Sequence, residues 1–392
     1  MYVRQLSLRD FRSWESVTLQ LGPGATVFTG RNGFGKTNLL ESLFYLANLR
    51  SHRVGSDQNL LRSGTSDAKI SATVENSGRE LTVEVVVTPG RANRAAINGA
   101  PARKARDVLG ILRTVMFAPE DLLLIRGDPG ERRRFLDDLA AMRGPRFVAA
   151  RADYDRVLRQ RSALLKTAAA AMRRGGQDAA SVVSTLDVWD GQLAAHGAQV
   201  TAARLDTVAA LAPHVIAAYA SIAPHSRPVA MRYRASAGAE IDGDGSPAPG
   251  AADVEYIEAV LLTRLAELRA KEIERGVCLV GPHRDDLDLH LGADLAKGYA
   301  SHGESWSLAL ALRLGSVELV RSDGVEPVLM LDDVFAELDA RRRSHLVDFV
   351  AGAEQLLITA AVAEDIPDEI GGRRVEVSVE DVEPGGRRSV LR

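Results

Sequence analysis

Apolar residues recur along the first hundred residues with the short spacing typical of β-strands. Two apolar sets, between 3 and 8 and between 17 and 21, predict a pair of antiparallel strands. Further strands are predicted at 70–74, 81–87 and 94–97, and the last runs into Asn98-Gly99, a strong hairpin-turn signal. An apolar run at 115–117 predicts one more strand. The chain therefore opens with a β-rich region.

Helical spacing replaces this pattern after residue 121. A helix is predicted from Glu131, and apolar residues three and four apart between 147 and 165 predict a second helix with an apolar seam. Such a seam favours helix-on-helix packing. Helical patterns continue over 182–220 and 253–275, and a strand and turn are predicted over 277–287. We therefore expect a discontinuous α/β head, 1–121 and 276–392, with an inserted helical arm domain at 122–275.

A phosphate-binding motif lies in the head. Val27 and Phe28 predict a buried strand, Gly30 to Thr37 match G-x-x-x-x-G-K-[ST], and helical spacing follows. Backbone N–H groups of such a loop surround an anion, and the helix N-terminus adds partial positive charge. We expect Lys36 to reach the β- and γ-phosphates of ATP and Thr37 to bind Mg²⁺. The candidate nucleotide-binding residues here are Gly30, Arg31, Asn32, Gly33, Phe34, Gly35, Lys36, Thr37 and Asn38.

Residues just ahead of the loop are candidates for the adenine. Arg12 could pack on the base with its guanidinium. Phe11 and Trp14 could do so with their rings, or could be ordinary packing residues.

A second candidate site follows a buried apolar run at 328–331. Asp332, at the end of this predicted parallel strand, would hold Mg²⁺, and Asp333 would orient or deprotonate the attacking water. Thr359 ends another apolar run and could sense the γ-phosphate. The candidate catalytic residues are therefore Lys36, Asp332 and Asp333, and the candidate metal ligands are Thr37 and Asp332. Ser301 and Gly303 open a strongly apolar helix and make a second helix N-terminus suited to phosphate.

Composition narrows the possibilities. A chain of 392 residues with 46% apolar residues has material for two or three packed domains. Its formal charge of −3 gives no global basic excess. The single cysteine, Cys278, excludes an internal disulfide and a cysteine-based zinc site. No uninterrupted apolar run approaches the roughly 18 residues of a membrane span, and the first residues lack the apolar core of a signal peptide. We expect a cytoplasmic protein.

Basic residues are nevertheless concentrated in the arm. Residues 143–174 contain nine Arg and Lys against Asp153 and Asp155. This could be a solvated helix face, or a surface that follows the phosphates of duplex DNA without reading sequence. Arg156, Arg159 and Arg161 are the candidate DNA contacts. His283 and Arg284 could serve DNA, nucleotide or fold.

These motifs together resemble the RecF family of DNA replication and repair proteins, in the SMC-like branch of ABC ATPases. The resemblance spans nearly the whole chain. It rests on 8–12, Gly30–Thr37, 118–122, 132–136, 280–287, Ser301-x-Gly303, Asp332-Asp333 and 337–339.

The resemblance implies a P-loop ATPase head with a mixed β-sheet and an ATP-dependent homodimer. Ser301 and Gly303 of one subunit would contact the γ-phosphate held by the other, and Asp339 would lie at the dimer seam. It also implies binding of double-stranded DNA near single-strand gaps, cooperation with RecR and RecO in loading RecA, a weak DNA-stimulated ATPase, a part in recombination and the SOS response, and a nucleoid-associated location.

Two departures from the family pattern bear on activity. Glu304 stands where glutamine is more usual and Trp306 is uncommon, which leaves signature contacts beyond Ser301 and Gly303 open. Asp333 replaces the glutamate of many ABC ATPases, and its shorter reach predicts slow hydrolysis. The alternative is an SMC-like ATP-gated clamp or scaffold with little or no hydrolysis. The arm is too short for an SMC chromosome organiser, and a transporter ATPase would need a membrane partner.

Overall fold

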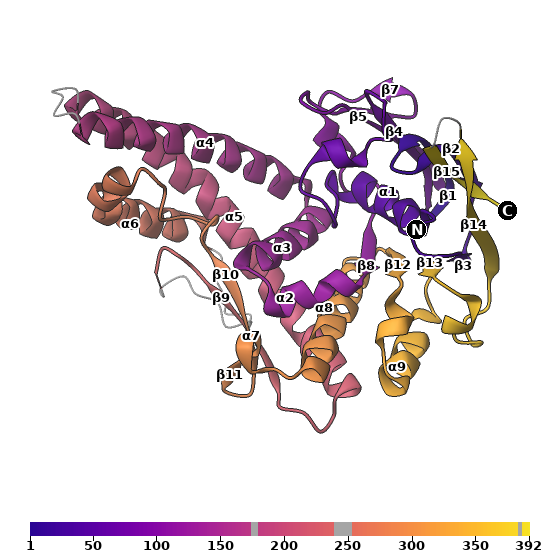
Figure 1. Cartoon of the computed structure of the whole chain (residues 1–392). Coiled ribbons are helices and arrows are strands. Elements are labelled where there is room, and N and C mark those ends of the chain that lie inside the picture. The colour runs from indigo at the N-terminus through magenta and orange to yellow at the C-terminus, as the bar shows by residue number, and fades with distance from the viewer. Residues whose placement is uncertain (174–178, 239–252, 383–385) are drawn as a thin grey trace. The chain divides into compact units, whose positions relative to one another are not determined.

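The computed structural model describes residues 1–173, 179–238, 253–382 and 386–392 (Figure 1). The chain divides into two compact units, one formed by 1–122 with 307–392 and the other by 123–306. The first boundary lies next to the predicted one. The return to the first unit comes at 307 rather than 276, because the strand at 286–291 pairs with one at 229–234 inside the second unit.

An antiparallel sheet forms one layer of the first unit. Its strands lie in the order β2-β1-β4-β5-β6-β7. They are β1 (Tyr2–Phe11), β2 (Trp14–Gln20), β4 (Ala68–Asn76), β5 (Arg79–Val87), β6 (Arg94–Ile97) and β7 (Ala100–Pro101). Buried and half-buried residues alternate along β4, as expected for a strand with one face on the core. Asn98 and Gly99 both have positive φ and form the predicted turn between β6 and β7.

A mostly parallel sheet forms the other layer. Its order is β15-β14-β3-β13-β12-β8, in which only β15 is antiparallel to its neighbour. The strands are β3 (Gly24–Thr29), β8 (Thr114–Phe117), β12 (Val328–Asp332), β13 (Gln355–Ala360), β14 (Arg373–Val382) and β15 (Gly386–Leu391). Every residue of β12 and β13 is buried, which explains their continuous apolar runs. The carboxyl ends of β3, β12 and β13 meet at one sheet edge.

Helix α1 (Lys36–Asn48) lies between the two sheets of the first unit. It contacts β8, β12 and β13 on one side and β1, β4 and β5 on the other. Ten of its 13 residues are buried, so it is apolar nearly all round. The remaining helices of this unit are α9 (Ala340–Val350) and most of α8 (His302–Ser322).

The second unit is mainly helical. Its helices are α2 (Leu122–Arg126), α3 (Pro129–Arg143), α4 (Pro145–Arg173), α5 (Ala179–Ile222), α6 (Val254–Arg275) and α7 (Ala296–Tyr299). The expected helix-on-helix packing is confirmed, because α4 packs along both α5 and α6 (Figure 1). The unit also contains an antiparallel sheet, β11-β10-β9, that the helical prediction missed. Its strands are β9 (Val229–Arg234), β10 (Asp286–Leu291) and β11 (Asp294–Leu295), and the strand predicted from 277 begins only at Asp286.

The central helix of the second unit is unusually apolar. The stretch Thr185–Ile222 of α5 is long and apolar enough to cross a membrane by length and composition. It packs against α3, α4, α6 and β9, and it buries Arg204, which pairs with Asp137 at 2.7 Å. Packing on several sides accounts for this apolar composition.

Candidate nucleotide-binding site

The phosphate loop joins β3 to α1, as the motif requires. Gly30, Gly33 and Gly35 have φ of 147°, 85° and 100°, backbone angles that residues with a Cβ rarely adopt. A Cβ at Gly30 would lie 2.2 Å from the carbonyl oxygen of Val377 in β14. The loop therefore needs glycine because of its backbone angles and because neighbouring atoms leave no room for a Cβ at Gly30.

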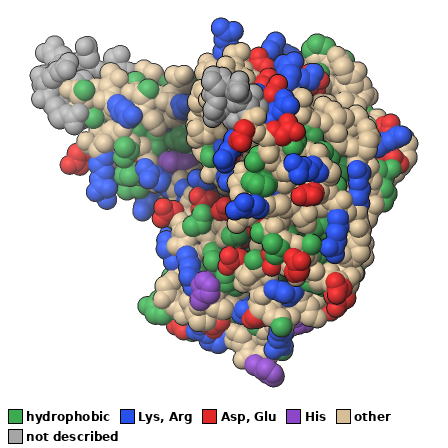
Figure 2. Space-filling model, turned by 45° about the vertical axis from the view of Figure 1, so that its right-hand side comes forward, with side chains coloured by type: hydrophobic (Ala, Val, Ile, Leu, Met, Phe, Trp, Pro, Cys, Tyr) green, Lys and Arg blue, Asp and Glu red, His purple; other side chains and the backbone are tan. Residues whose placement is uncertain are grey.

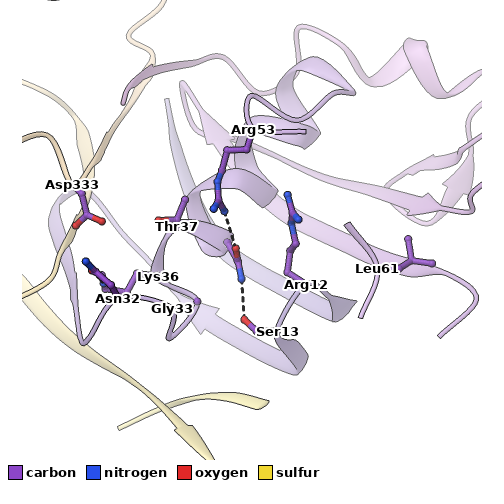
Figure 3. Close-up of a pocket in the computed structure, with 11 residues that line it drawn as sticks. Arg12, Ser13, Asn32, Gly33, Lys36, Thr37, Arg53, Leu61 and Asp333 are labelled. Carbon is purple, nitrogen blue, oxygen red and sulfur yellow. Dashed lines mark hydrogen bonds between the residues drawn. The ribbon is translucent and has the colours of Figure 1, made fainter. Parts of the chain in front are cut away.

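A cavity of about 540 Å³ opens over the loop (Figure 3). All its lining residues belong to the first unit. They are Arg12, Ser13, Asn32, Gly33, Gly35, Lys36, Thr37, Asn38, Arg53, Leu61 and Asp333. Most of the predicted loop residues thus face one space, together with three residues that the motif did not indicate: Ser13, Arg53 and Leu61.

Lys36 places its ammonium group at the mouth of the loop. Nζ donates to the carbonyl of Gly30 at 2.6 Å, and the carbonyl of Arg31 and Oδ1 of Asn32 lie at 3.4 Å. Burial lowers the pKa of Lys36, and the nearby carboxylates of Asp333 and Asp332 oppose that shift. The ammonium is therefore held within the loop that the motif assigns to phosphate binding.

Asp332 joins the loop helix to two strands. Its Oδ1 accepts hydrogen bonds from Thr37 at 2.8 Å and from Thr359 at 2.6 Å. Burial raises the pKa of Asp332 to about 6, although the bonds from the two threonines oppose that rise. Hydroxyl and carboxylate oxygens are the hard ligands that Mg²⁺ prefers. The predicted pair of metal ligands, Thr37 and Asp332, is therefore in direct contact.

The backbone of Asp333 has an unusual conformation that one hydrogen bond holds in place. Its φ of 50° places it in the left-handed region, and its N–H donates to the hydroxyl of Thr359 at 3.0 Å. Burial raises the pKa of the Asp333 carboxyl, and Lys36 partly counteracts this rise. A cavity-lining carboxylate with a raised pKa is a better proton acceptor than an ordinary carboxylate. The hydroxyl of Thr359 therefore contacts both aspartates.

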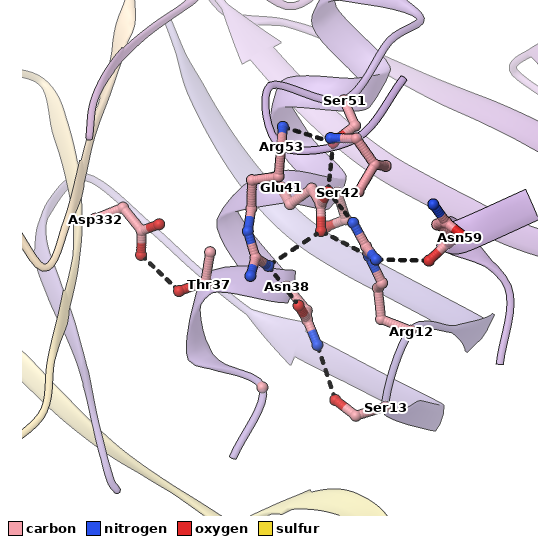
Figure 4. A network of polar contacts seen from close by, with 12 residues as sticks. Arg12, Ser13, Thr37, Asn38, Glu41, Ser42, Ser51, Arg53, Asn59 and Asp332 are labelled. Atoms are coloured by element: carbon pink, nitrogen blue, oxygen red, sulfur yellow. Dashed lines mark hydrogen bonds and ion pairs between the residues drawn. The ribbon is translucent and has the colours of Figure 1, made fainter. Parts of the chain in front are cut away.

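Arg12 lines the cavity. It also forms an ion pair with the buried Glu41, which the motif did not indicate (Figure 4). Its Nε and Nη2 donate to Glu41 at 2.9 and 2.6 Å, and Nη1 donates to the carbonyl of Asn59 at 2.6 Å. Glu41 is fully buried and also lies 3.7 Å from Arg53. A glutamate within the apolar run of α1 was the available signal in the sequence. Arg12 and Arg53 are thus fixed side by side at the cavity.

Phe11 and Trp14 are packing residues. Both side chains are fully buried, so neither ring can stack on a base. The indole N–H of Trp14 instead donates to the carbonyl of Gly35 at 3.1 Å. Of the three residues considered for the adenine, only Arg12 faces the cavity.

The signature residues lie in the second unit, at the start of α8. The N–H of Ser301 donates to Glu304 at 2.9 Å, and the N–H of Glu304 donates to the Ser301 hydroxyl at 3.2 Å. This reciprocal pair is a capping box, and it lowers the pKa of Glu304. Glu304 therefore caps the helix beside Gly303, a role glutamine can also fill, and Trp306 is buried. In the first unit, Asp339 caps α9 by accepting from the N–H of Arg342.

The arm helix α4 corrects one candidate DNA contact. Arg161 is fully buried and pairs with Asp190 and Glu272, so its proposed contact with DNA is wrong. Arg156 and Arg159 are exposed, and Arg156 lies 3.2 Å from Asp153. Only these two remain candidates.

His283 and Arg284 are engaged within the second unit. The ring of His283 bonds Tyr154 at 2.6 Å through Nδ1 and the carbonyl of Cys278 at 3.3 Å through Nε2. Arg284 donates to the same carbonyl at 3.1 Å. These contacts tie 278–284 together.

Comparison with known proteins gives consistent matches. The family model described as the RecF/RecN/SMC N-terminal domain matches residues 2–370. A curated DNA replication and repair protein RecF from Rhodococcus erythropolis (strain PR4) is 60% identical over 390 residues, which are 98% of this chain and 95% of that protein.

Solved structures match over nearly the whole chain as well. A structure of the recombination mediator protein RecF with ATP, described as part of the RecFOR pathway, has a TM-score of 0.84 at 25% identity and covers 96% of this chain and 95% of its own. An SMC head bound to the C-winged helix domain of ScpA has a TM-score of 0.52 at 16% identity over 100% and 98% of the two chains, and it supports the fold alone.

Proposed function

This chain belongs to the RecF family of DNA replication and repair proteins, and we propose that it is an ATP-gated DNA-binding protein that hydrolyses ATP slowly. The observation that carries this proposal is the 2.8 Å hydrogen bond between Thr37 and Asp332, residues 295 positions apart. A phosphate loop and an acidic strand end at one sheet edge are the two halves of a nucleoside triphosphatase site.

The loop residues would bind and orient the triphosphate. Lys36 would neutralise the β- and γ-phosphates, while the backbone N–H groups of the loop would donate hydrogen bonds to the same anion. Arg12 and Arg53 stand at the cavity with Glu41 behind them, so they would meet the nucleotide without first losing side-chain freedom.

Two aspartates would divide the remaining work. Mg²⁺ bound by Thr37 and Asp332 would neutralise charge on the phosphates. Asp333 would hold the attacking water and take its proton as the water oxygen forms a bond to the γ-phosphorus and the bond to the β-phosphate oxygen breaks, giving ADP and phosphate. The left-handed backbone of Asp333 and its bond to Thr359 favour one position of the carboxylate.

Pairing of two copies would follow from ATP binding. Ser301 and Gly303 open α8, and the partial positive charge at the N-terminus of this helix suits the γ-phosphate of a partner subunit. A nucleotide that contacts both copies stabilises the dimer only while it is intact. Asp339 would lie at the same seam.

DNA binding is proposed to involve the arm rather than the whole surface. Figure 2 shows Lys and Arg interspersed with Asp and Glu over the face that it draws, consistent with the net charge of −3. The exposed Arg156 and Arg159 on α4 would contact duplex phosphates near single-strand gaps. The description of a solved relative as part of the RecFOR pathway supports cooperation with RecR and RecO. We further propose that this cooperation loads RecA, in the cytoplasm at the nucleoid.

The test separates binding from hydrolysis. We expect Lys36→Ala to weaken ATP binding at least 100-fold by calorimetry, because the phosphates lose their cation. Asp333→Asn should keep ATP binding and pairing but lower phosphate release about 100-fold. Phosphate release by Asp333→Asn at the wild-type rate would contradict the assigned role. If wild-type protein also releases no phosphate while binding ATP and DNA, the second candidate holds, an ATP-gated clamp without hydrolysis, which the short carboxylate of Asp333 favours.

A further inference from the structure

The C-terminal hairpin, formed by β14 and β15, contacts the phosphate loop at the loop's first and last glycines, Gly30 and Gly35. At the first end, β14 pairs with β3 up to Glu376 and Thr29, and the next carbonyl, that of Val377, lies against Gly30. At the second end, a Cβ on Gly35 would lie 2.4 Å from the hydroxyl of Ser389 in β15. The hairpin lies beyond residue 370, where the family match ends.

Ser389 makes a specific contact with the loop. Its side chain is nearly fully buried, and its hydroxyl donates to the carbonyl of Phe34 at 2.6 Å. The hydroxyl of Ser13 lies 2.6 Å from that of Ser389. A serine hydroxyl has one proton, so both contacts are hydrogen bonds at the same time when Ser389 donates to Phe34 and Ser13 donates to Ser389.

This contact extends into the cavity wall. The side-chain amide of Asn38 donates to Ser13 at 2.9 Å, and Arg53 donates to Asn38 at 3.3 Å (Figures 3 and 4). The backbone N–H of Ser389 also donates to the carbonyl of Ser13 at 2.9 Å. A continuous chain of hydrogen bonds therefore runs from the hairpin to a cavity-lining arginine.

The hydrogen bond from Ser389 to the Phe34 carbonyl also fixes the direction of an N–H group in the loop. In a planar trans peptide the C=O and N–H point in opposite directions. Ser389 holds the carbonyl of Phe34, which fixes the N–H of Gly35, and Trp14 holds the carbonyl of Gly35, which fixes the N–H of Lys36. Both N–H groups therefore point away from the hairpin and from Trp14.

We propose that the C-terminal hairpin is a positioning element for the phosphate loop, and that Ser389, with Trp14, aims the N–H groups of Gly35 and Lys36 at the bound phosphates. The inference rests on the proposed function in so far as those phosphates belong to ATP. Ser389 touches no reacting atom, so it is a positioning residue. A loop held in its binding conformation before ATP arrives loses less entropy on binding.

The hairpin supplies a matched control for the test. Ser378 in β14 is buried like Ser389, but its hydroxyl has no hydrogen-bond partner among the described residues. Ser389→Ala and Ser378→Ala thus remove the same atom from the same hairpin. We expect Ser389→Ala to weaken ATP binding about three- to tenfold by calorimetry, the range of one neutral hydrogen bond. Ser378→Ala should stay within about twofold, because the hydroxyl that it removes holds no part of the loop.

Amide hydrogen exchange supplies a second readout that needs no nucleotide. Faster exchange across residues 33–38 in Ser389→Ala, but not in Ser378→Ala, is the expected result. Equal exchange in the two variants and wild type, or equal ATP affinity, would overturn the positioning role. If wild-type protein fails to bind ATP, the proposed function falls, while the exchange rates still decide whether the hairpin holds the loop.

Discussion

His283 is held neutral by its surroundings, which makes stability depend on pH. Burial, with smaller contributions from Arg284, Arg133 and Arg151, lowers the pKa of His283 to about 4, although its contact with the Cys278 carbonyl opposes the shift. Because the folded pKa lies below the ordinary value near 6.5, the unfolded chain binds the proton more readily. The stabilising contribution is complete above pH 6.5 and is lost as pH falls toward 4.

We predict that the free energy of unfolding falls by about 1–2 kcal/mol between pH 7 and pH 5 on account of this residue. His283→Asn should remove that part of the pH dependence in urea titrations at the two pH values. His52 in the first unit has its pKa lowered to about 4, chiefly by burial, so some dependence should remain. The exposed His225 is the control. If His225→Asn reduced the pH dependence of the free energy of unfolding as much as His283→Asn, the assignment to His283 would be contradicted.

Which residues could be foreseen depended on how local their partners are. The loop glycines, Lys36 and Thr37 were identified because a short pattern fixes their backbone. Asp332 was identified because it ends a buried strand. Glu41 was missed because its burial requires α1 to lie between two sheets, a tertiary fact. Ser389 was missed for the same reason, since its partner lies 355 positions away.

At the level of elements, α4 shows how an apolar seam can include a charge. Tyr154, Val157, Leu165 and Ala168 are buried at three-and-four spacing, and Arg161 lies in register with them. The helical period alone therefore placed Arg161 on the packed face. Counting basic residues along the sequence could not separate it from Arg156 and Arg159.

Replacing Arg161 tests this interpretation. Arg161→Ala leaves Asp190 and Glu272 buried with one partner fewer, so we expect a loss of about 3–5 kcal/mol in the free energy of unfolding. Arg156→Ala removes an exposed pair with Asp153 and should cost less than about 1 kcal/mol. Urea denaturation measures both, and similar losses in the two variants would refute the buried network as a source of stability.

The exposed part of the same helix carries the DNA hypothesis. We expect Arg156→Gln with Arg159→Gln to weaken duplex binding and to lower the slope of log affinity against log salt by about 2, one for each lost phosphate contact. Arg374→Gln with Arg387→Gln removes two exposed charges from the C-terminal hairpin and serves as the control. An unchanged salt slope in the arm variant would leave α4 as a solvated face. Fluorescence anisotropy with a gapped duplex measures these slopes.

Secondary structure was easier to foresee than the pairing of distant segments. The strands of the first unit and the long helices of the second follow from periods of two and 3.6 residues. Strand β9 lies between the predicted helices at 182–220 and 253–275, where no element was predicted, and its pairing with β10 joins residues 229–234 to 286–291. That contact holds 276–306 in the second unit, which no periodicity reveals.

At the scale of the whole molecule, ATP-dependent pairing requires each copy to supply two different surfaces. The first unit provides the loop and both aspartates, and the second provides Ser301 at the start of α8. If Ser301 acts in trans, the two surfaces that contact one nucleotide belong to two different copies. We expect Ser301→Arg to keep ATP binding within about twofold and to prevent pairing, because the larger cation fills the space of the γ-phosphate. Lys36→Ala should lose both binding and pairing.

Sedimentation velocity with and without ATP and Mg²⁺ tests whether ATP brings two copies of this chain together. We expect a monomer without nucleotide, a dimer with ATP, and a monomer under both conditions for Lys36→Ala. A wild-type sedimentation coefficient that is the same with and without ATP would contradict it.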